Sequence, residues 1–396
     1  MWATGRGGLV LGAVAVMAFG CGPGGAAGTS GPTGSGGSDA SGGGGGTAPG
    51  ISAITAGYEI GCAVVDGGLR CWGSNSIGLL SSAASSFLTS PVAVPGFGSG
   101  VSAAAIGSLD MCAVVDGAVR CWGDNQWGQL GDGTTMASTT PVAVQGASAG
   151  VTALAAGGEF ACAIIGGAAE CWGTNQGGKL GNGSTTPQSP VPSGVQGLSS
   201  GVTSIGASGG HSCAVMNGAA FCWGLNDGLG VGPSALGSGP FQVPGLTSGV
   251  TDISAGAFHS CAVVAGAAWC WGKNRNGNLG DGTMNDSIVP VAVQGLTSGV
   301  TAIVAGDFST CAIVNGGVQC WGLNERGQLG DGSTTNSAIP VAVQGLDAGV
   351  TGIAMGDEFV CVTVGGGVRC WGYNAVGQLG NGSQLNSSVP VQVQLP

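Results

Sequence analysis

The feature that most constrains this chain is a repeat of about 50 residues, which runs from Ile51 to the end of the sequence. Its successive copies start at Ile51, Val101, Val151, Val202, Val250, Val300 and Val350. In a chain of this kind each unit packs only against its neighbours. The repeated segment therefore needs no single large core, and its length does not imply several separate domains.

Each copy contains four short apolar or alternating runs, which read VTAIVAG, CAIV, VQCWG and IPVAV in the copy that starts at Val300. None is long enough, or periodic enough at 3.6 residues, to indicate a helix. Four short strands repeated seven times predict an all-β fold, a seven-bladed β-propeller with four antiparallel strands per blade. An open β-solenoid is the alternative, although its coils are usually shorter. The predicted blades are 51–100, 101–150, 151–201, 202–249, 250–299, 300–349 and 350–396.

The third run leads into a W-G-x-N-x-x-G-x-L-G-x-G motif, which is intact after Trp122, Trp172, Trp271, Trp321 and Trp371. This motif resembles the regulator of chromosome condensation repeat family, and the resemblance covers 51–396. It implies a propeller that binds other proteins, since relatives include a nuclear guanine-nucleotide exchange factor and exported bacterial proteins that dock on enzymes. The copies after Trp72 and Trp223 depart from the motif. We expect altered loops on one face of those two blades.

Between the second and third runs lies a dipeptide that suits a type I′ turn, in which both central residues have positive φ. These dipeptides are Asp66-Gly67, Asp116-Gly117, Gly166-Gly167, Asn217-Gly218, Ala265-Gly266, Asn315-Gly316 and Gly365-Gly366. A two-residue turn fixes the register of the hairpin. It places one cysteine opposite another at a non-hydrogen-bonded site, where Cα atoms lie about 4.5 Å apart, within disulfide range. The predicted disulfides are Cys62–Cys71, Cys112–Cys121, Cys162–Cys171, Cys213–Cys222, Cys261–Cys270, Cys311–Cys320 and Cys361–Cys370.

Zinc is the alternative use of these cysteines. A structural zinc site needs four ligands, usually with C-x₂₋₄-C spacing. The C-x₈-C spacing offers two thiolates per blade, and the sequence adds only His211 and His259. We therefore expect disulfides and no metal.

The N-terminal segment predicts export and lipid anchoring. Arg6 precedes an apolar run from Leu9 to Phe19 that is too short to span a bilayer, which is typical of a signal peptide. The run ends in Ala18-Phe19-Gly20-Cys21, which resembles the bacterial lipobox with Ala18 in place of the usual Leu. The blades use fourteen of the 15 cysteines, so Cys21 is left as the lipidation residue. An ordinary secretory signal with an incidental cysteine is the alternative.

These features divide the chain into a lipoprotein-type signal peptide at 1–20, a Gly/Ser-rich flexible tether at 21–50, and the propeller at 51–396. Disulfides require an oxidising compartment. We expect a bacterial cell-envelope protein that is lipid-anchored, with the outer membrane preferred, or a secreted one. The chain has 8 basic and 19 acidic residues and a net charge of −11, with no cationic stripe. Such a surface disfavours nucleic acid, because phosphate contacts need clustered Lys and Arg.

Residues that suit catalysis are scarce. His211 and His259 share one position of the repeat, where other copies have Ile60, Asp110, Phe160, Ser309 and Phe359. This variability indicates a structural role. The recurring Asp132, Asp281 and Asp331, with Asn182 and Asn381 in two copies, suit Asx-turns. No EF-hand pattern, G-x-S-x-G or H-E-x-x-H occurs, so we expect no enzyme and no cofactor.

Aromatic residues have two predicted roles. One tryptophan per copy is expected to fill the wedge between neighbouring blades, namely Trp72, Trp122, Trp172, Trp223, Trp271, Trp321 and Trp371. Aromatic and arginine side chains that break the repeat are candidate partner contacts, because these residue types are enriched at interfaces. The candidates are Trp127, Trp269, Arg275, Arg326, Tyr373 and Phe241. For ring closure we expect the terminal strand Val389–Gln394 to join the first blade beside Ile51–Gly57.

The sequence therefore predicts a monomeric, membrane-tethered interaction scaffold that binds a protein partner through propeller loops. One alternative is a polysaccharide-active hydrolase or lyase, which would need two carboxylates about 5–10 Å apart in a pocket. Another is a structural envelope or adhesion component. Guanine-nucleotide exchange follows from the resemblance alone. It is not carried over, because an exported chain would not meet a cytosolic GTPase.

Overall fold

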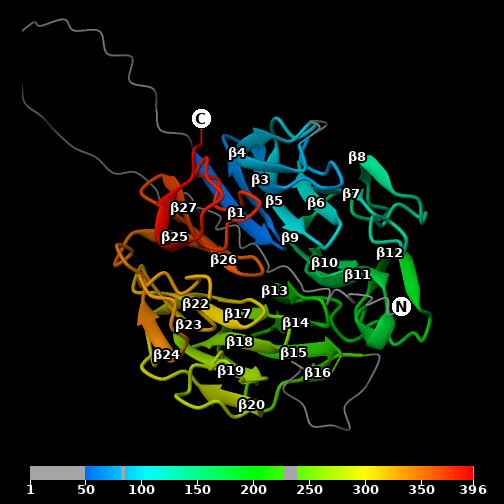
Figure 1. The fold of residues 1–396 in the computed structure, drawn as a ribbon. Helices are drawn as coiled ribbons and strands as arrows, with labels where there is room; N and C mark the ends of the chain where they lie inside the picture. Colours follow the sequence, from blue (N-terminus) through cyan, green and yellow to red (C-terminus); the bar gives the residue numbers. More distant parts are fainter. Residues whose placement is uncertain (1–49, 82–84, 226–238, 396) are drawn as a thin grey trace, which may run out of the picture.

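The computed structural model describes residues 50–81, 85–225 and 239–395. Within them, twenty-eight strands form seven four-stranded antiparallel sheets, each built from consecutive strands in the order of the chain. The first strands of neighbouring sheets contact one another all the way round, from β1 to β25 and back to β1. The sheets therefore form a closed ring with these strands innermost (Figure 1). The predicted all-β, seven-bladed propeller is confirmed.

Blades one to four contain β1 (Ile51–Gly57), β2 (Ile60–Val65), β3 (Gly68–Ser74), β4 (Phe87–Ala93), β5 (Val101–Ile106), β6 (Asp110–Val115), β7 (Ala118–Gly123), β8 (Ser138–Ala143), β9 (Val151–Ala156), β10 (Phe160–Ile165), β11 (Ala168–Thr174), β12 (Gln188–Gly194), β13 (Val202–Ala207), β14 (His211–Met216), β15 (Ala219–Gly224) and β16 (Phe241–Gln242). Blades five to seven contain β17 (Val250–Ala255), β18 (His259–Val264), β19 (Ala267–Gly272), β20 (Ser287–Ala292), β21 (Val300–Ala305), β22 (Ser309–Val314), β23 (Gly317–Gly322), β24 (Ser337–Ala342), β25 (Val350–Met355), β26 (Phe359–Val364), β27 (Gly367–Gly372) and β28 (Ser387–Gln392). One 3₁₀ turn, η1 (Gln176–Gly178), lies in a loop of blade three.

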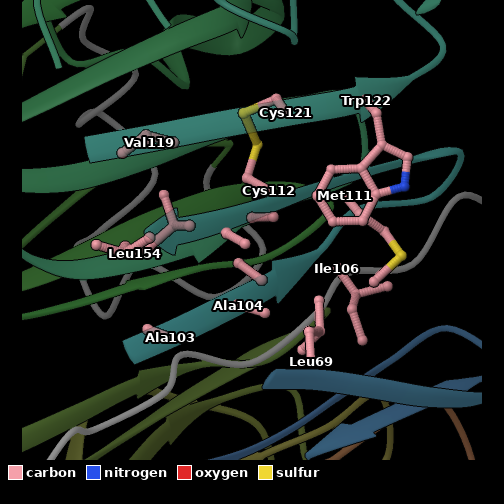
Figure 2. Packing of buried hydrophobic residues seen from close by; sticks show 14 of the residues in the cluster. Leu69, Ala103, Ala104, Ile106, Met111, Cys112, Val119, Cys121, Trp122 and Leu154 are labelled. Atoms are coloured by element: carbon pink, nitrogen blue, oxygen red, sulfur yellow. A yellow bond between two sulfur atoms is a disulfide. The ribbon is translucent and has the colours of Figure 1, made fainter. Parts of the chain in front are cut away.

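The second and third strands of every blade form the predicted hairpin. Both central turn residues have positive φ in all seven blades, as at Asp66 (51°) and Gly67 (76°). The register that this turn imposes places the two cysteines of each hairpin directly opposite each other. All seven predicted disulfides are formed, with Cα–Cα distances of 4.0–4.1 Å. Figure 2 shows Cys112–Cys121 joining β6 and β7 beside Trp122.

Neighbouring blades are joined through one fully buried tryptophan per blade, as predicted. The indole N–H of Trp172 donates to the backbone oxygen of Gln129 in the preceding blade at 2.9 Å. The ring also packs on Gly131, where an added Cβ would lie 2.9 Å from it. Equivalent indole bonds to the preceding blade are made by Trp72, Trp122, Trp223, Trp321 and Trp371. The motif glycine therefore makes room for the tryptophan of the next blade.

Ring closure differs from the prediction. The prediction that Val389–Gln394 joins the first blade is wrong, because β28 pairs with β27 of its own blade. The first blade already has four strands of its own, with β4 as the outermost, so it leaves no gap for a terminal strand. Closure comes instead from contacts like those between other blades. Trp72 donates to the Gln378 oxygen at 2.8 Å, and the Gly382 N–H donates to the Thr89 oxygen at 2.8 Å.

The strand directions define two faces of the ring. We call the side with the first-to-second-strand turns and the third-to-fourth-strand loops the loop face. We call the side with the seven type I′ turns and the connections between blades the turn face. The predicted signal peptide, Cys21 and nearly all of the predicted tether lie outside the described residues. Within the described part of the chain, no helix is long and apolar enough to cross a membrane.

The disulfides give a direct chemical prediction. In the denatured but unreduced chain, we expect a thiol reagent to label no cysteine of the blades, and after reduction to label fourteen more cysteines than before. Mass spectrometry of the alkylated peptides measures both states. Labelling of any hairpin cysteine before reduction in freshly purified protein would contradict the pairing.

Candidate functional site

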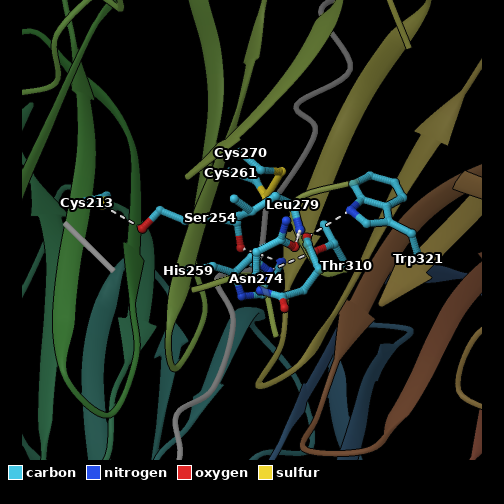
Figure 3. Close-up of a disulfide and its surroundings, with 12 residues drawn as sticks. Cys213, Ser254, His259, Cys261, Cys270, Asn274, Leu279, Thr310 and Trp321 are labelled. Atoms are coloured by element: carbon cyan, nitrogen blue, oxygen red, sulfur yellow. Dashed lines mark hydrogen bonds between the residues drawn. A yellow bond between two sulfur atoms is a disulfide. The ribbon is translucent and has the colours of Figure 1, made fainter. Parts of the chain in front are cut away.

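In the six blades whose W-G-x-N asparagine lies within the described residues, the third-to-fourth-strand loop is fixed by this one buried side chain. Asn125 accepts the Leu130 N–H at 2.9 Å and donates to the Met136 oxygen at 3.0 Å. Asn274 accepts from Leu279 in the same way (Figure 3). Equivalent bonds to a leucine N–H are made by Asn75, Asn175, Asn324 and Asn374. Each of these loops is therefore held by hydrogen bonds between its backbone and a buried side chain.

The aspartates of the L-G-D-G segment make the predicted Asx-turns. The Asp132 carboxylate accepts the N–H of Thr134 at 2.9 Å, and the Asp281 and Asp331 carboxylates make the same bond two residues on. Asn182 and Asn381 replace them with side-chain amide oxygens, at 3.0 and 3.1 Å. These residues therefore shape the loops.

Two of the six predicted contact residues lie on strands. Trp269 is half-buried in β19 and pairs across the sheet with Ala262, and Phe241 is half-buried in β16. The other four, Trp127, Arg275, Arg326 and Tyr373, follow the third strand of their blades and therefore lie on the loop face. Arg326 lies over the Tyr373 ring at 5.4 Å and pairs with Glu358 at 3.6 Å. The structure thus brings Arg326 and Tyr373 together.

An acidic group that the sequence reading missed lies where the innermost strands turn on the loop face. We call Glu59, Asp307, Asp357 and Glu358 the acidic mouth; they come from the first-to-second-strand turns of blades one, six and seven. The Asp357 N–H donates to the Tyr58 oxygen at 3.2 Å, so the turns of blades seven and one touch. Phe258 and Phe308 stack beside this group, with ring centroids 5.3 Å apart.

Burial and mutual repulsion disfavour ionisation in the acidic mouth. Burial, and then the charges of Glu59 and Glu358, raise the pKa of Asp357 to about 7. Burial, Asp357 and Glu358 together hold the pKa of Asp307 well above its usual range. Asp307 is 3% exposed, and its Oδ1 has no hydrogen-bond partner within the described residues. Among the described residues, the one ion pair that these four carboxyl groups make is that of Glu358 with Arg326, so the group holds more acidic than basic side chains.

The two histidines have structural roles, in line with their prediction. The His211 Nε2 shares a hydrogen bond of 2.7 Å with Ser260 of the next blade. His259 Nε2 shares one of the same length with Thr310 of the next blade (Figure 3). Burial lowers the pKa of His211 to about 4. Burial, and then the charge of His211, lowers the pKa of His259 to about 3. Both rings are therefore neutral near pH 7 and tie blades together.

A cavity of about 110 Å³ opens on the loop face between blades one and two. Its walls include Tyr58, Glu59, Ile77, Leu79, Ser108 and Leu109. Tyr58 has φ 52°, a left-handed conformation that bulky residues rarely adopt. Glu59 is the one carboxylate in the lining, and its partial burial raises its pKa. The cavity therefore lacks the carboxylate pair that glycoside hydrolysis uses.

The geometry defines a repeat-built propeller with anchored loops and an acidic mouth on one face. The chain belongs to the regulator of chromosome condensation (RCC1) repeat family: the repeat matches residues 116–164, 171–215, 217–263, 265–313, 315–363 and 365–396, and a second form of it matches 300–328. None of the curated proteins matches the sequence. The match begins at residue 116, within blade two, and leaves out blade one, which is one of the two blades whose motif is incomplete.

Solved structures with the same fold include two well-covered relatives. Human WBSCR16 is 21% identical with a TM-score of 0.69, and the alignment covers 78% of this chain and 86% of that one. Prp20p from Saccharomyces cerevisiae is 20% identical with a TM-score of 0.70, and 86% of each chain is covered. At these identities the likeness shows the fold.

The buried carboxylate of Asp110 gives a stability prediction. It occupies the repeat position of His211, but blade three has Ala161 where the hydroxyl partner would be, and neither of its oxygens has a partner within the described residues. Burial, then Asp124 and Glu159, holds the pKa of Asp110 well above its usual range. Because the unfolded chain ionises first, Asp110 lowers stability increasingly as pH rises above about 4.

We expect Asp110→Ser, which copies Ser309 of blade six, to raise the free energy of unfolding at pH 7 by about 1–3 kcal/mol. The gain should shrink as pH falls toward 4. Denaturant unfolding of the disulfide-intact chain at several pH values measures it. Asp347→Ser, at an exposed position, is the control, and we expect no gain in stability from it at pH 7. A loss of stability at pH 7 in Asp110→Ser would show that the carboxylate is paired.

Proposed function

We propose that this chain is a membrane-tethered protein-interaction scaffold of the RCC1 repeat type, acting as a monomer and binding a protein partner through its loop face. The observation that carries the proposal is the contrast between the two faces. The turn face repeats one type I′ hairpin seven times. The loop face carries the residues that differ between blades, including exposed apolar loop tips at Met136 (72%), Met284 (53%) and Leu385 (78%).

Three exposed apolar loop tips on one face of a rigid frame offer contacts to a partner, because removing apolar surface from water favours association. Here the frame is fixed by seven disulfides and by the buried asparagines, so the loops need little ordering when a partner binds. The acidic mouth on the same face adds electrostatic selectivity, because clustered charge suppresses wrong partners and speeds association with right ones.

The structural relatives support a protein partner. The work on Prp20p describes its binding to Gsp1p and histones, and another structure shows yeast RCC1 (Prp20) bound by Kap60. We propose protein binding for this chain from the shared fold and from its own loop face. Nucleotide exchange is not proposed. Seven disulfides indicate an oxidising, extracytoplasmic location, where a cytosolic GTPase is not present.

Binding is also favoured over catalysis by the size of the cavity. Sites for small-molecule substrates usually enclose about 300–1,000 Å³, whereas this cavity has about 110 Å³. Within the part of the chain that the structure describes, no three His, Cys, Asp or Glu side chains are grouped so as to hold a metal.

For the tether we propose that Cys21 is diacylated, with the Gly/Ser-rich segment that follows it linking the propeller to the membrane, preferably the outer one. A flexible chain of this length spans on the order of 30 Å. Metabolic labelling with radioactive palmitate in a bacterial host should label the wild-type chain and not Cys21→Ser. The variant should also appear in the soluble fraction with its hairpin disulfides intact. An unlabelled wild-type chain that is nevertheless exported would support the ordinary secretory signal instead.

The binding face is tested by affinity capture from envelope extract with the full chain, followed by mass spectrometry. We expect a partner whose recovery falls about tenfold or more with Met136→Ser, Met284→Ser and Leu385→Ser combined. The matched control combines Ile288→Ser and Ile339→Ser, which remove exposed apolar side chains from the outer strands β20 and β24. Equal loss in both variants, or loss in the control alone, would exclude the loop face as the binding surface.

A further inference from the structure

The cavity between blades one and two exists because blade one departs from the repeat. Where intact blades have a buried amide such as Gln328 or Gln378, which accepts a backbone N–H of its own loop, blade one has Leu79. An apolar side chain cannot make that bond. Leu79 and Ile77 instead form an apolar wall, and Leu109 of blade two, 45% exposed, forms part of the lining.

The turn that supplies the carboxylate of the cavity is also unlike its counterparts. β1 continues to Gly57 and pairs with Ile60, so Tyr58 and Glu59 form a tight two-residue turn. Tyr58 has positive φ, whereas none of the equivalent residues in the other six turns does. Strained backbone of this kind persists where the surroundings hold it, and it concentrates at binding sites. This turn places both side chains in the lining of the cavity.

The size of the cavity limits its occupant. A volume of about 110 Å³ is well below the roughly 300–1,000 Å³ of sites for small-molecule substrates. That is room for one extended side chain, and it is too small for a typical small-molecule substrate. The lining combines aliphatic side chains with one carboxylate. Lys and Arg fit this combination, because they bury an aliphatic stem and leave the charged head at a polar edge.

Charge around the cavity favours the same occupant. Asp357 lies on the turn that bonds to Tyr58, and the charge of Glu59 contributes to the raised pKa of Asp357, so the two carboxyl groups interact. Glu358 has one ion pair, with Arg326, whose side chain is about half exposed. A cation entering beside Glu59 would relieve the repulsion among these carboxylates, while an anion would increase it.

We propose that this cavity receives a lysine or arginine side chain of the protein partner, with its stem along Leu79 and Leu109 and its charged head paired with Glu59. The inference rests on the proposed function and adds the chemistry of the partner, a basic residue presented to the loop face. Glu59 is then the residue that selects the charge of the partner, and the acidic mouth attracts the basic segment around it.

The test uses the full chain and the peptide Ac-Ala-Ala-Lys-Ala-Ala-NH₂, titrated by NMR. Peptides with arginine, norleucine or glutamate at the central position complete the set, since norleucine keeps an aliphatic stem without the charge. We expect the lysine or the arginine peptide to bind the wild-type chain about tenfold more tightly than the norleucine peptide. The glutamate peptide should not bind.

Glu59→Gln should abolish that preference, lowering the affinity for the basic peptide about tenfold. The matched control is Glu159→Gln, which removes a carboxylate at the equivalent turn position of blade three, outside the cavity lining. We expect its affinity to stay within about twofold of the wild-type value. Thermal unfolding of both variants checks that each keeps the fold.

Three results would overturn the proposal: equal weakening by both substitutions, which indicates general charge attraction; norleucine binding as tightly as lysine and arginine; or no binding of any basic peptide. A failure of this inference can be told apart from a failure of the proposed function. If envelope capture still depends on the loop tips Met136, Met284 and Leu385 while the peptides do not bind, the loop face is the binding surface and the cavity is not its basic-residue site.

Discussion

The ring depends on the contact that each tryptophan makes with the preceding blade. At five of the seven junctions a motif glycine leaves room for the indole, and within the described residues six of the seven indole N–H groups reach a backbone oxygen of the neighbouring blade. Tryptophan buries a large apolar area while its N–H still needs a partner. Each such contact therefore fixes both the spacing and the orientation of two blades, and repeating it from Trp72 to Trp371 closes the ring without an exchanged strand.

The tryptophan is held in place by the residue before it. Every motif tryptophan follows a disulfide-bonded cysteine on the third strand. The disulfide links the third strand, which carries the indole, to the second strand of the same hairpin. Much of the core between the blades is alanine and valine, which bury little area per side chain. A disulfide that closes a ten-residue loop contributes at most about 2.5 kcal/mol in the chain-entropy account. Seven of them offset the thin cores and leave the loops free to vary.

Local patterns explain how much the sequence could predict. The type I′ dipeptides set the hairpin register within ten residues, so the blades and disulfide pairs followed directly from residues such as Asp66-Gly67. Ring closure was predicted wrongly because it depends on whether blade one has its own outer strand, and β4 lies in one of the two irregular copies. The acidic mouth was missed because Glu59 and Asp357 are about 300 residues apart in the sequence and meet only around the axis. Aligning the seven copies and comparing their equivalent turn positions would have revealed these acidic residues.

Blade one is also where the described residues depart from the symmetry of the ring. In most blades the junction with the next blade is filled by three repeated side chains: the amide side chain and the leucine of the motif, and the tryptophan of the next blade. At blade one, Leu79 replaces the amide, Tyr58 takes a strained conformation, and Phe97 packs against Trp122 with ring centroids 4.6 Å apart. Phe97 supplies apolar volume beside Trp122, so the junction stays closed at its core. The space that the substitutions leave therefore appears at the solvent edge, on the loop face and next to the acidic mouth, where a partner can reach it.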